Sequence, residues 1–234
     1  MRPTLFPIRR PRVGISVSAS ALSLVALRRP WFRRPIVKQV LERPLPSGLL
    51  KVSATEPHIT DLDAFAQELR ALTEGLSERT IALSVPNRAM HMGVFAFDRF
   101  PDDPEERAGL IKWRFREDLN LTIGDARVML QVFPAGTRTQ VLAVAVRQTI
   151  LDQYEDVCAR AGLIPVSMGF SHLQLIGLYR RLMKGARRLC VMHWAGDEFM
   201  LLLFDQGQPV CLRTKSMTGG TQDLRRELVG TLQY

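Results

Sequence analysis

The residues best suited by type to acid–base chemistry are five carboxylates clustered between residues 98 and 106. A pair of carboxylates can act as a general acid and a general base. The cluster falls at an expected turn and helix start, however, where acidic side chains cap exposed backbone N–H groups. We therefore interpret these residues as capping rather than catalytic: Asp98, Asp102, Asp103, Glu105 and Glu106.

Histidines are the side chains that most often bind metals or transfer protons near neutral pH. His193 could act as a ligand or a base, but His58, His91 and His172 form no ligand spacing with it. We therefore expect His193 to be hydrogen-bonded locally, and we expect no metal site.

The three cysteines show neither pairing nor motif. Cys158, Cys190 and Cys211 lie far apart and lack the spacing of a zinc site or a redox motif. We expect buried, reduced thiols, as in a cytosolic protein.

Length and composition indicate a folded protein of one large or two small domains. The chain has 234 residues, of which 46% are hydrophobic, and this share is normal for a packed core. Every apolar run is shorter than the ~20 residues that a membrane-spanning helix needs. The composition therefore indicates a soluble or peripheral protein.

The formal net charge of +9 is concentrated near the N-terminus. Only Glu42 opposes the following basic residues: Arg2, Arg9, Arg10, Arg12, Arg28, Arg29, Arg33, Arg34, Lys38 and Arg43. Trp31 and Phe32 lie among them, and such a mixture suits anionic lipid headgroups or nucleic acid. A solvated basic surface is an equally good interpretation. Between the two partners we favour an anionic membrane surface over nucleic acid, because no nucleic-acid-binding motif accompanies the charge.

The stretch RVGISVSASALSLVALRR, residues 12–29, could be a secretory signal or the first β-hairpin of the fold. Basic residues before an apolar stretch are typical of a signal. Serines interrupt the stretch, however, and arginines follow it without a convincing cleavage site. Because Val13, Ile15 and Val17 alternate with small residues, and a second apolar run spans 22–27, we favour the hairpin.

Hydrophobic periodicity and turn residues predict an α/β protein. We expect helices at 61–74, 103–119, 150–162, 171–184 and from 221. We expect strands at 13–17, 22–27, 36–41, 80–86, 90–97, 126–133, 139–147, 163–170, 189–196, 198–207 and 209–217.

Two of these helices have well-marked ends and apolar faces. Thr60 or Asp61 can cap the first helix, and its inward residues are Leu62, Phe65, Ala66, Leu69 and Leu72. Asp103 can cap the second helix, and its inward residues are Ala108, Ile111, Phe115 and Leu119. We expect Trp113 of the second helix in the core rather than at a docking surface.

A unit of three strands followed by a helix occurs near residue 12 and again near residue 189. Such a recurrence indicates two domains built alike. A tandem start of this kind is typical of actin-like ATPases, which have a ribonuclease-H-like fold.

The sequence resembles the type IV pilus assembly protein PilM family from about Arg12 to its end. Four segments carry the resemblance in order: VGISVSASALSLVAL, EERAGLIKWRFREDLNLTI, VLAVAVRQTILDQYEDVCARAGLIPVSM and RTKSMTGG. They are similar to the family's opening hairpin with its phosphate loop, its Glu-rich helix, its strand, helix and turn, and the stretch that closes its nucleotide pocket. The secretion protein GspL shares the cytoplasmic fold and is the alternative.

The resemblance implies an α/β protein with the actin-like ATPase (ribonuclease-H-like) fold. The expected divisions are a basic arm at 1–11, a first domain at 12–188 with an inserted subdomain around 88–147, and a partial second domain at 189–234. Residues 189–234 would be only the start of their domain, and strand residues such as Leu189, Val191, Met200, Leu202 and Phe204 would lack cover and lie half exposed. We expect residues 1–185 to fold stably and 189–234 to be loosely held, or packed against the first domain or a second copy.

PilM-like proteins lie under the inner membrane, bind the cytoplasmic tail of the membrane protein PilN, and often hold ATP between their domains. That ATP site needs an Asp-x-Gly loop in each domain, because backbone N–H groups approach the phosphates while an Asp organises Mg²⁺. In this chain Ser16 and Ser18 stand where the first loop should have its Asp and Gly. In the second loop His193 stands at the acidic position and is followed by the bulky Trp194. The degenerate positions are Ser16, Ser18, Ser20, His193, Gly196, Gly219 and Gly220.

The resemblance and its departures together predict a non-catalytic scaffold without bound ATP or Mg²⁺. We expect it in the cytoplasm, peripheral on the inner membrane, in a type IV pilus platform with a PilN-like protein and other platform components. We expect the PilN-like tail among residues 84–97 and on the helix bearing Trp113, partly by strand addition. The alternatives are an active actin-like ATP-binding protein and a GspL-like component of a type II secretion system.

Overall fold

The computed structural model describes residues 11–28, 35–119, 121, 124–135, 138–179, 186–195 and 198–216. The chain divides into two compact units. Unit 1 comprises Met1–Pro86 and Thr149–Ser171, and unit 2 comprises Asn87–Gln148 and His172–Tyr234. The domain boundaries expected from the sequence remain predictions.

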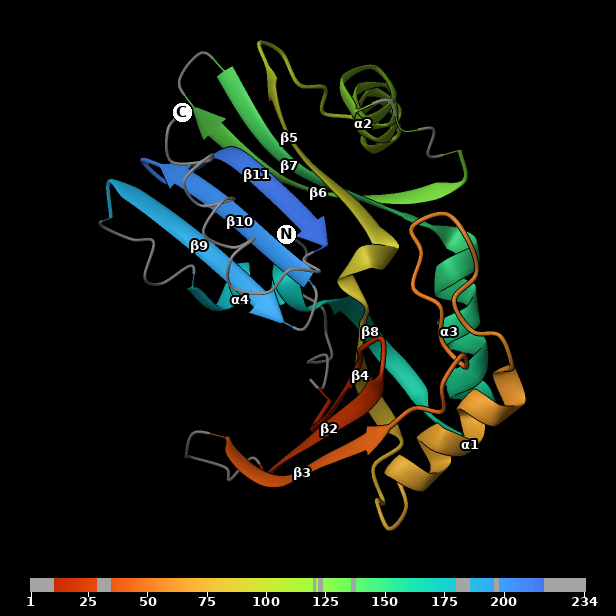
Figure 1. Cartoon of the computed structure of the whole chain (residues 1–234). Helices are drawn as coiled ribbons and strands as arrows, with labels where there is room; N and C mark the ends of the chain where they lie inside the picture. The colour runs from red at the N-terminus through yellow and green to blue at the C-terminus, as the bar shows by residue number, and fades with distance from the viewer. Residues whose placement is uncertain are drawn as a thin grey trace. The chain divides into compact units, whose positions relative to one another are not determined.

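Unit 1 is built on a five-stranded mixed sheet with the strand order β3-β2-β1-β4-β8 (Figure 1). Its elements are β1 (Val13–Val17), β2 (Ala21–Arg28), β3 (Ile36–Pro44), α1 (Leu62–Leu72), β4 (Thr80–Val85), α3 (Gln148–Arg160) and β8 (Ile164–Phe170). β1, β2 and β3 pair antiparallel, whereas β4 pairs parallel with both β1 and β8. The first two strands form the predicted hairpin.

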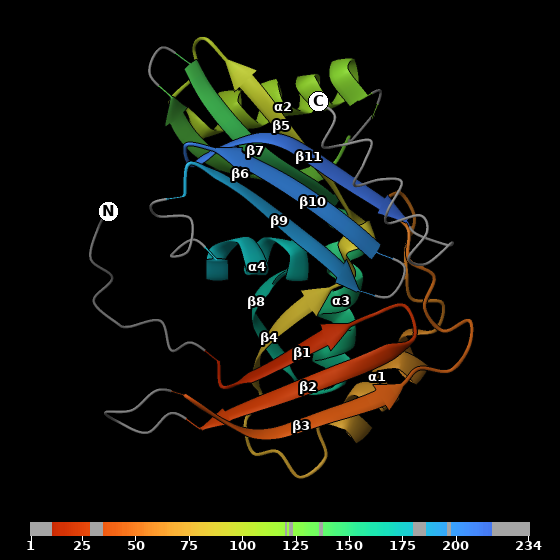
Figure 2. The ribbon, with the colours of Figure 1, turned by 60° about the vertical axis from the view of Figure 1, so that its left-hand side comes forward.

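Alternation along the strands decides which face of this sheet meets helices. Val13, Ile15 and Val17 are buried, whereas Gly14 and Ser16 between them are partly exposed. Both α1 and α3 lie on the same face (Figures 1 and 2). Their buried residues are Phe65, Ala66, Leu69, Leu72, Ile150, Leu151, Tyr154, Val157 and Cys158. The inward face predicted for residues 61–74 is therefore confirmed in its main positions.

Unit 2 contains two three-stranded antiparallel sheets, with the orders β5-β7-β6 and β11-β10-β9. Its elements are the 3-10 turn η1 (Asn87–Ala89), β5 (Met90–Phe97), α2 (Pro104–Leu119), β6 (Ala126–Ala135), β7 (Arg138–Arg147), α4 (Ser171–Tyr179), β9 (Arg188–Ala195), β10 (Glu198–Asp205) and β11 (Gln208–Ser216). Helix α2 packs on one face of the β5-β7-β6 sheet, and the β11-β10-β9 sheet packs on the other (Figure 2).

The two faces of β7 supply two different cores. One core lies under α2 and contains Phe95, Ile111, Phe115, Ala126, Val141, Ala143 and Ala145. The other joins the two sheets and contains Leu142, Val191, Met200, Leu202 and Phe204. Of the arrangements expected for the strands after residue 189, packing against the predicted first domain agrees with the structure. The β5-β7-β6 sheet, which lies within residues 12–188, covers Val191, Met200, Leu202 and Phe204, so these four side chains are not left half exposed.

The helix caps predicted from the sequence are confirmed. The Asp61 carboxylate accepts two backbone N–H groups of the first turn of α1, at 3.0 and 2.9 Å. The Asp103 carboxylate accepts two N–H groups in α2, both at 2.9 Å. Asp103 therefore acts as a helix cap, as expected. Asp98 and Asp102 of the same acidic cluster instead form ion pairs with Arg138 and Arg107.

Several predicted burials are wrong. Trp113 and Leu119 of α2 are 46% and 44% exposed. The side of this helix that packs against the sheet carries its two buried residues, Ile111 and Phe115. Of the cysteines, Cys158 is buried, Cys211 is partly exposed and Cys190 is exposed on β9.

The predicted extension of α4 to Lys184 and the helix from Thr221 lie outside the described residues. Among the described helices, none combines the length and the apolar character that crossing a bilayer requires.

Candidate functional site

The turn between β1 and β2 stands where the first phosphate loop was expected. The Ser18 N–H and the Ser18 hydroxyl both donate to the Ala21 carbonyl oxygen, at 2.9 and 3.0 Å. The Ala21 N–H donates in return to Ser18 Oγ at 3.0 Å. The turn therefore engages the N–H groups of Ser18 and Ala21 within itself, whereas a phosphate loop points such groups at its ligand.

The neighbouring serines are also engaged in the sheet. Ser16 lies inside β1, opposite Ser23 of β2 and Ser84 of β4. The carbonyl oxygen of Ser20 accepts the N–H of Leu45 at 2.8 Å. At the position where an acidic residue would organise Mg²⁺, the sheet thus presents a row of hydroxyl groups, which are neutral and weak ligands for that ion.

The second expected loop corresponds to the end of β9. His193 and Trp194 lie opposite Met200 and Phe199 of β10, and Trp194 is 40% exposed. Gly196, Gly219 and Gly220 lie outside the described residues. The bulky Trp194 side chain is thus part of a strand pair rather than of a glycine-rich loop.

His193 packs against a second histidine, which the sequence analysis did not foresee. Its ring meets that of His172, the second residue of α4, edge to face with 4.7 Å between centroids. Neither ring nitrogen of the buried His172 has a hydrogen-bond partner, and the Nδ1 atom of His193 also lacks one. The expected local hydrogen bond is therefore wrong for this nitrogen of His193.

Burial keeps both rings neutral near pH 7. It lowers the pKa of His172 to about 4, because the charged ring would be desolvated and would face His193. It lowers the pKa of His193 as well, and the Glu198 carboxylate partly offsets this shift. A neutral pair of rings can pack together where two charged rings would repel each other.

Asn87 of η1 connects the same residues. Its side-chain amide donates to the Glu198 carboxylate at 2.7 Å, and its Oδ1 accepts the His172 N–H at 3.0 Å. Within the described part of the chain, no group of three or more His, Cys, Asp or Glu residues is placed to hold a metal ion. The arrangement therefore works as a structural joint between η1, α4 and the β9–β10 hairpin.

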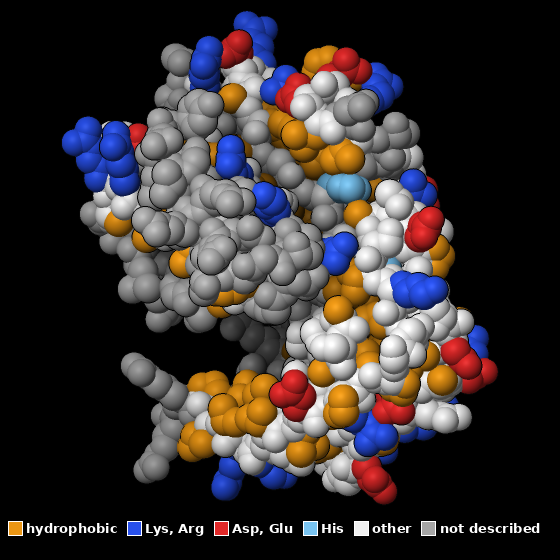
Figure 3. All heavy atoms as spheres, in the orientation of Figure 1, with side chains coloured by type: hydrophobic (Ala, Val, Ile, Leu, Met, Phe, Trp, Pro, Cys, Tyr) orange, Lys and Arg blue, Asp and Glu red, His pale blue; other side chains and the backbone are white. Residues whose placement is uncertain are grey.

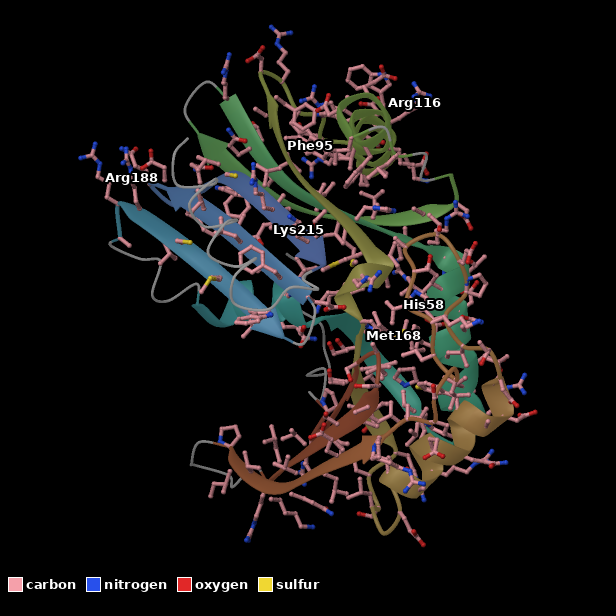
Figure 4. All side chains as sticks on the ribbon, in the orientation of Figure 1. His58, Phe95, Arg116, Met168, Arg188 and Lys215 are labelled. Atoms are coloured by element: carbon pink, nitrogen blue, oxygen red, sulfur yellow. The ribbon has the colours of Figure 1, made fainter. Side chains whose placement is uncertain are left out.

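The region predicted to bind a membrane-protein tail is spread over both units. Residues 84–86 belong to unit 1, and 87–97 form η1 and β5 of unit 2. Trp113 is half exposed on α2, and the Arg114 guanidinium lies 6.0 Å from the centre of its ring. The same guanidinium lies 5.6 Å from the ring of Phe95, which is labelled beside α2 in Figure 4.

An apolar pocket of about 160 Å³ lies instead beside β6 in unit 2. It is lined by Met129, Leu130, Gln131, Leu142, Val144 and Leu173. Met129 lies opposite Val144, and Gln131 lies opposite Leu142, in the β6–β7 pair. β6 is an edge strand of its sheet among the described strands. Sequence analysis missed this pocket because its lining combines the β6–β7 hairpin with Leu173 of α4, which is distant along the chain.

No protein-family model and no curated protein matches the sequence significantly. Solved structures match its fold. The PilM–PilN type IV pilus biogenesis complex matches with a TM-score of 0.72 and 21% identity, over 97% of this chain and 67% of that chain.

Two further structures agree. A Bacteroides thetaiotaomicron protein with an actin-like ATPase fold and unknown function has a TM-score of 0.55 and 11% identity, over 94% of this chain and 75% of its own. The cytoplasmic domain of EpsL, an inner-membrane component of the type II secretion system of Vibrio cholerae, has a TM-score of 0.51 and 7% identity, over 87% of this chain and 70% of its own. The predicted actin-like ATPase fold is confirmed, and at these identities the similarity concerns the fold.

Proposed function

We propose that this chain is a non-catalytic component of a pilus or secretion assembly platform, peripheral on the cytoplasmic side of the inner membrane. In this role it binds the extended cytoplasmic tail of a PilN-like membrane protein. One observation carries the proposal: an actin-like fold has a closed serine turn where its first phosphate loop is expected.

The closed turn argues against nucleotide chemistry in a specific way. Phosphate binding by a loop depends on backbone N–H groups that point at the ligand, whereas the Ser18 and Ala21 N–H groups bond within the turn. Mg²⁺ binding depends on carboxylate oxygens, and Ser16 and His193 stand at the two positions where acidic residues were expected. Both losses leave the fold intact as a binding platform.

The pocket beside β6 supports a docking site for an extended peptide. A peptide strand can pair with an open sheet edge, and its alternate side chains then point to one face of that sheet. An apolar side chain of the tail would enter the pocket next to Met129, while the peptide backbone pairs with β6. The sequence analysis placed the docking site at residues 84–97, which include the edge strand β5, and at Trp113. This proposal places it at β6, the other edge strand of the β5-β7-β6 sheet.

A peptide titration tests this site. The ligand is a fluorescent synthetic peptide with the sequence of the cytoplasmic tail of a PilN-like membrane protein. Met129→Lys puts a charge at the apolar pocket, and Met192→Lys is its control, because Met129 and Met192 are both exposed methionines on edge strands of unit 2.

We expect the wild type and Met192→Lys to bind the peptide alike, and Met129→Lys to bind it at least about tenfold more weakly. Equal affinities of all three proteins would refute the β6 site. A loss of affinity in Trp113→Ala alone would return the docking site to α2 and β5. No saturable binding by the wild type would refute the proposed function itself.

A further inference from the structure

Exposed aliphatic side chains gather on β2 and β3 of unit 1, where Figure 3 shows hydrophobic atoms at the surface. We call Val25, Val37 and Val40 the β2–β3 patch. Val37 and Val40 are 57% and 64% exposed, which is unusual for valines within a sheet. A contiguous apolar surface of this kind indicates a binding partner more often than isolated exposed residues do.

The pairing register makes the patch continuous. Val40 lies directly opposite Val25, and Val37 lies opposite Leu27. Val25 alternates along β2 with Leu24 and Ala26, which are buried. Because successive side chains of a strand point to opposite faces, the valines of the patch point away from α1 and α3.

Three cations that have no ion-pair partner among the described residues lie near the patch. The Arg12 carbonyl oxygen accepts the Leu27 N–H at 2.7 Å, which places Arg12 beside the patch, and Arg28 and Lys38 are exposed on the two strands themselves. None of the three forms an ion pair with a described carboxylate.

The basic residues near the helices of unit 1 differ in this respect. Arg43 is paired with Glu68 of α1, and Arg160 is paired with Asp63 at 2.7 Å. The positive charge around the β2–β3 patch is therefore available to an external anion, whereas the charges of Arg43 and Arg160 are already paired.

The charge of the whole chain follows the same division. Residues 1–43 contain ten Lys and Arg and one Glu, and the rest of the chain contains 22 basic and 22 acidic residues. The entire net charge of +9 thus comes from the part of the sequence that contains β2 and most of β3. An external anionic surface would be attracted most strongly to this part of the chain.

We propose that the β2–β3 patch rests on an anionic lipid surface. The exposed valines would enter the boundary between headgroups and acyl chains, and Arg12, Arg28 and Lys38 would lie at the level of the lipid phosphates. A nucleic acid would use the cations but would gain nothing from exposed valines, so the combination favours lipid. This inference rests on the membrane location in the proposed function but not on the binding of a tail peptide.

Sedimentation with lipid vesicles tests the inference with the full chain. The probes are vesicles of phosphatidylcholine alone and vesicles of phosphatidylcholine mixed with phosphatidylglycerol. We expect binding to the anionic vesicles alone, and we expect that binding to weaken as salt screens the charges. The vesicles contain no membrane protein, so the result is independent of the peptide titration.

Matched variants locate the surface. Val40→Asp is compared with Val210→Asp, because Val210 is a 52% exposed valine on β11. Lys38→Glu is compared with Lys51→Glu, because Lys51 is an exposed lysine of unit 1 beyond residue 43. We expect Val40→Asp and Lys38→Glu to weaken vesicle binding roughly tenfold or more, and the two controls to change it by less than about twofold.

Three outcomes would overturn the inference. They are equal binding to both kinds of vesicle, equal losses in the patch variants and their controls, and tighter binding to a single-stranded RNA than to anionic vesicles at the same phosphate concentration. Thermal melting followed by circular dichroism confirms that each variant is folded before its binding is compared.

Discussion

The β1–β2–β3 and β9–β10–β11 meanders have the same antiparallel order but are buried by different layers. In unit 1, helices cover one face of the meander, and β4 extends its sheet in parallel beside β1. In unit 2, a second sheet covers the meander, and β9 pairs with β10 alone among the described strands. The comparison shows that an apolar strand face determines that something must cover it, but not whether a helix or a sheet does so.

The largest expected effect comes from shortening one buried side chain in the middle strand of each meander. Leu24 of β2 and Leu202 of β10 are both fully buried. We expect Leu24→Ala and Leu202→Ala each to lower the free energy of unfolding by about 2 to 5 kcal/mol, because each leaves a cavity in a packed core. Urea unfolding measures both changes.

The exposed valines of the same meanders provide the controls. Val25→Ala and Val210→Ala should each change the free energy of unfolding by less than about 0.5 kcal/mol. If Leu202→Ala cost less than about 1 kcal/mol while Leu24→Ala kept its full effect, the second meander would be loosely held and the comparison would fail.

Each unit contains a buried histidine that makes stability depend on pH, because burial lowers the pKa of His58 as well as that of His172. The pKa of His172 in the folded chain lies near 4, below its ordinary value of 6.5. A lowered pKa means that the unfolded chain binds the proton more tightly, so stability is lost as the pH falls from 6.5 towards 4. The free energy of unfolding falls by about 1.4 kcal/mol per pH unit for each proton taken up on unfolding. In His172→Leu the slope of this free energy against pH should be smaller by the contribution of one proton.

His58 of unit 1 is the matched buried histidine, and it is hydrogen-bonded. Its Nδ1 lies 2.9 Å from the Tyr154 hydroxyl, and its Nε2 bonds to the Ser53 carbonyl oxygen (Figure 4 labels His58). At pH 8 we therefore expect His58→Leu to cost about 1 to 3 kcal/mol, and His172→Leu less than about 1 kcal/mol. An unchanged pH profile of His172→Leu between pH 4 and 6.5 would contradict the account.

The smallest expected effects come from the helix caps, which should be equal in the two units. Asp61→Ala and Asp103→Ala each remove a carboxylate that accepts two backbone N–H groups. We expect a loss of about 1 kcal/mol in each variant. Asp61→Asn and Asp103→Asn should restore most of it, since asparagine also caps helices, and failure of this rescue in one unit would indicate a different role for that carboxylate.

Much of the fold could be predicted from local sequence because its determinants are local. The alternation in β1, the helical spacing of Phe65 and Leu69, and the caps Asp61 and Asp103 all act within a few residues. Trp113 was wrongly predicted to be buried. Only one side of helix α2 packs against the three-stranded sheet, so apolar residues on its other sides remain exposed.

The candidate site was less predictable because it depends on contacts between distant segments. The His172–His193 pair joins α4 to β9, and the pocket beside Met129 needs residues of β6, β7 and α4. Neither arrangement leaves a spacing pattern in the sequence. The loss of acidic residues at Ser16 and His193 could be noticed from the sequence, but the closed turn around Ser18 required the structure.

Calorimetric titration of the full chain with Mg·ATP tests the central claim most directly, namely that an actin-like ATPase fold here serves as a binding platform without its nucleotide. We expect no saturable heat, because the N–H groups of Ser18 and Ala21 bond within the turn and no carboxylate stands at position 16 or 193. Micromolar binding whose heat disappears in Gly219→Glu would contradict the claim and would identify the chain as an active ATP-binding protein.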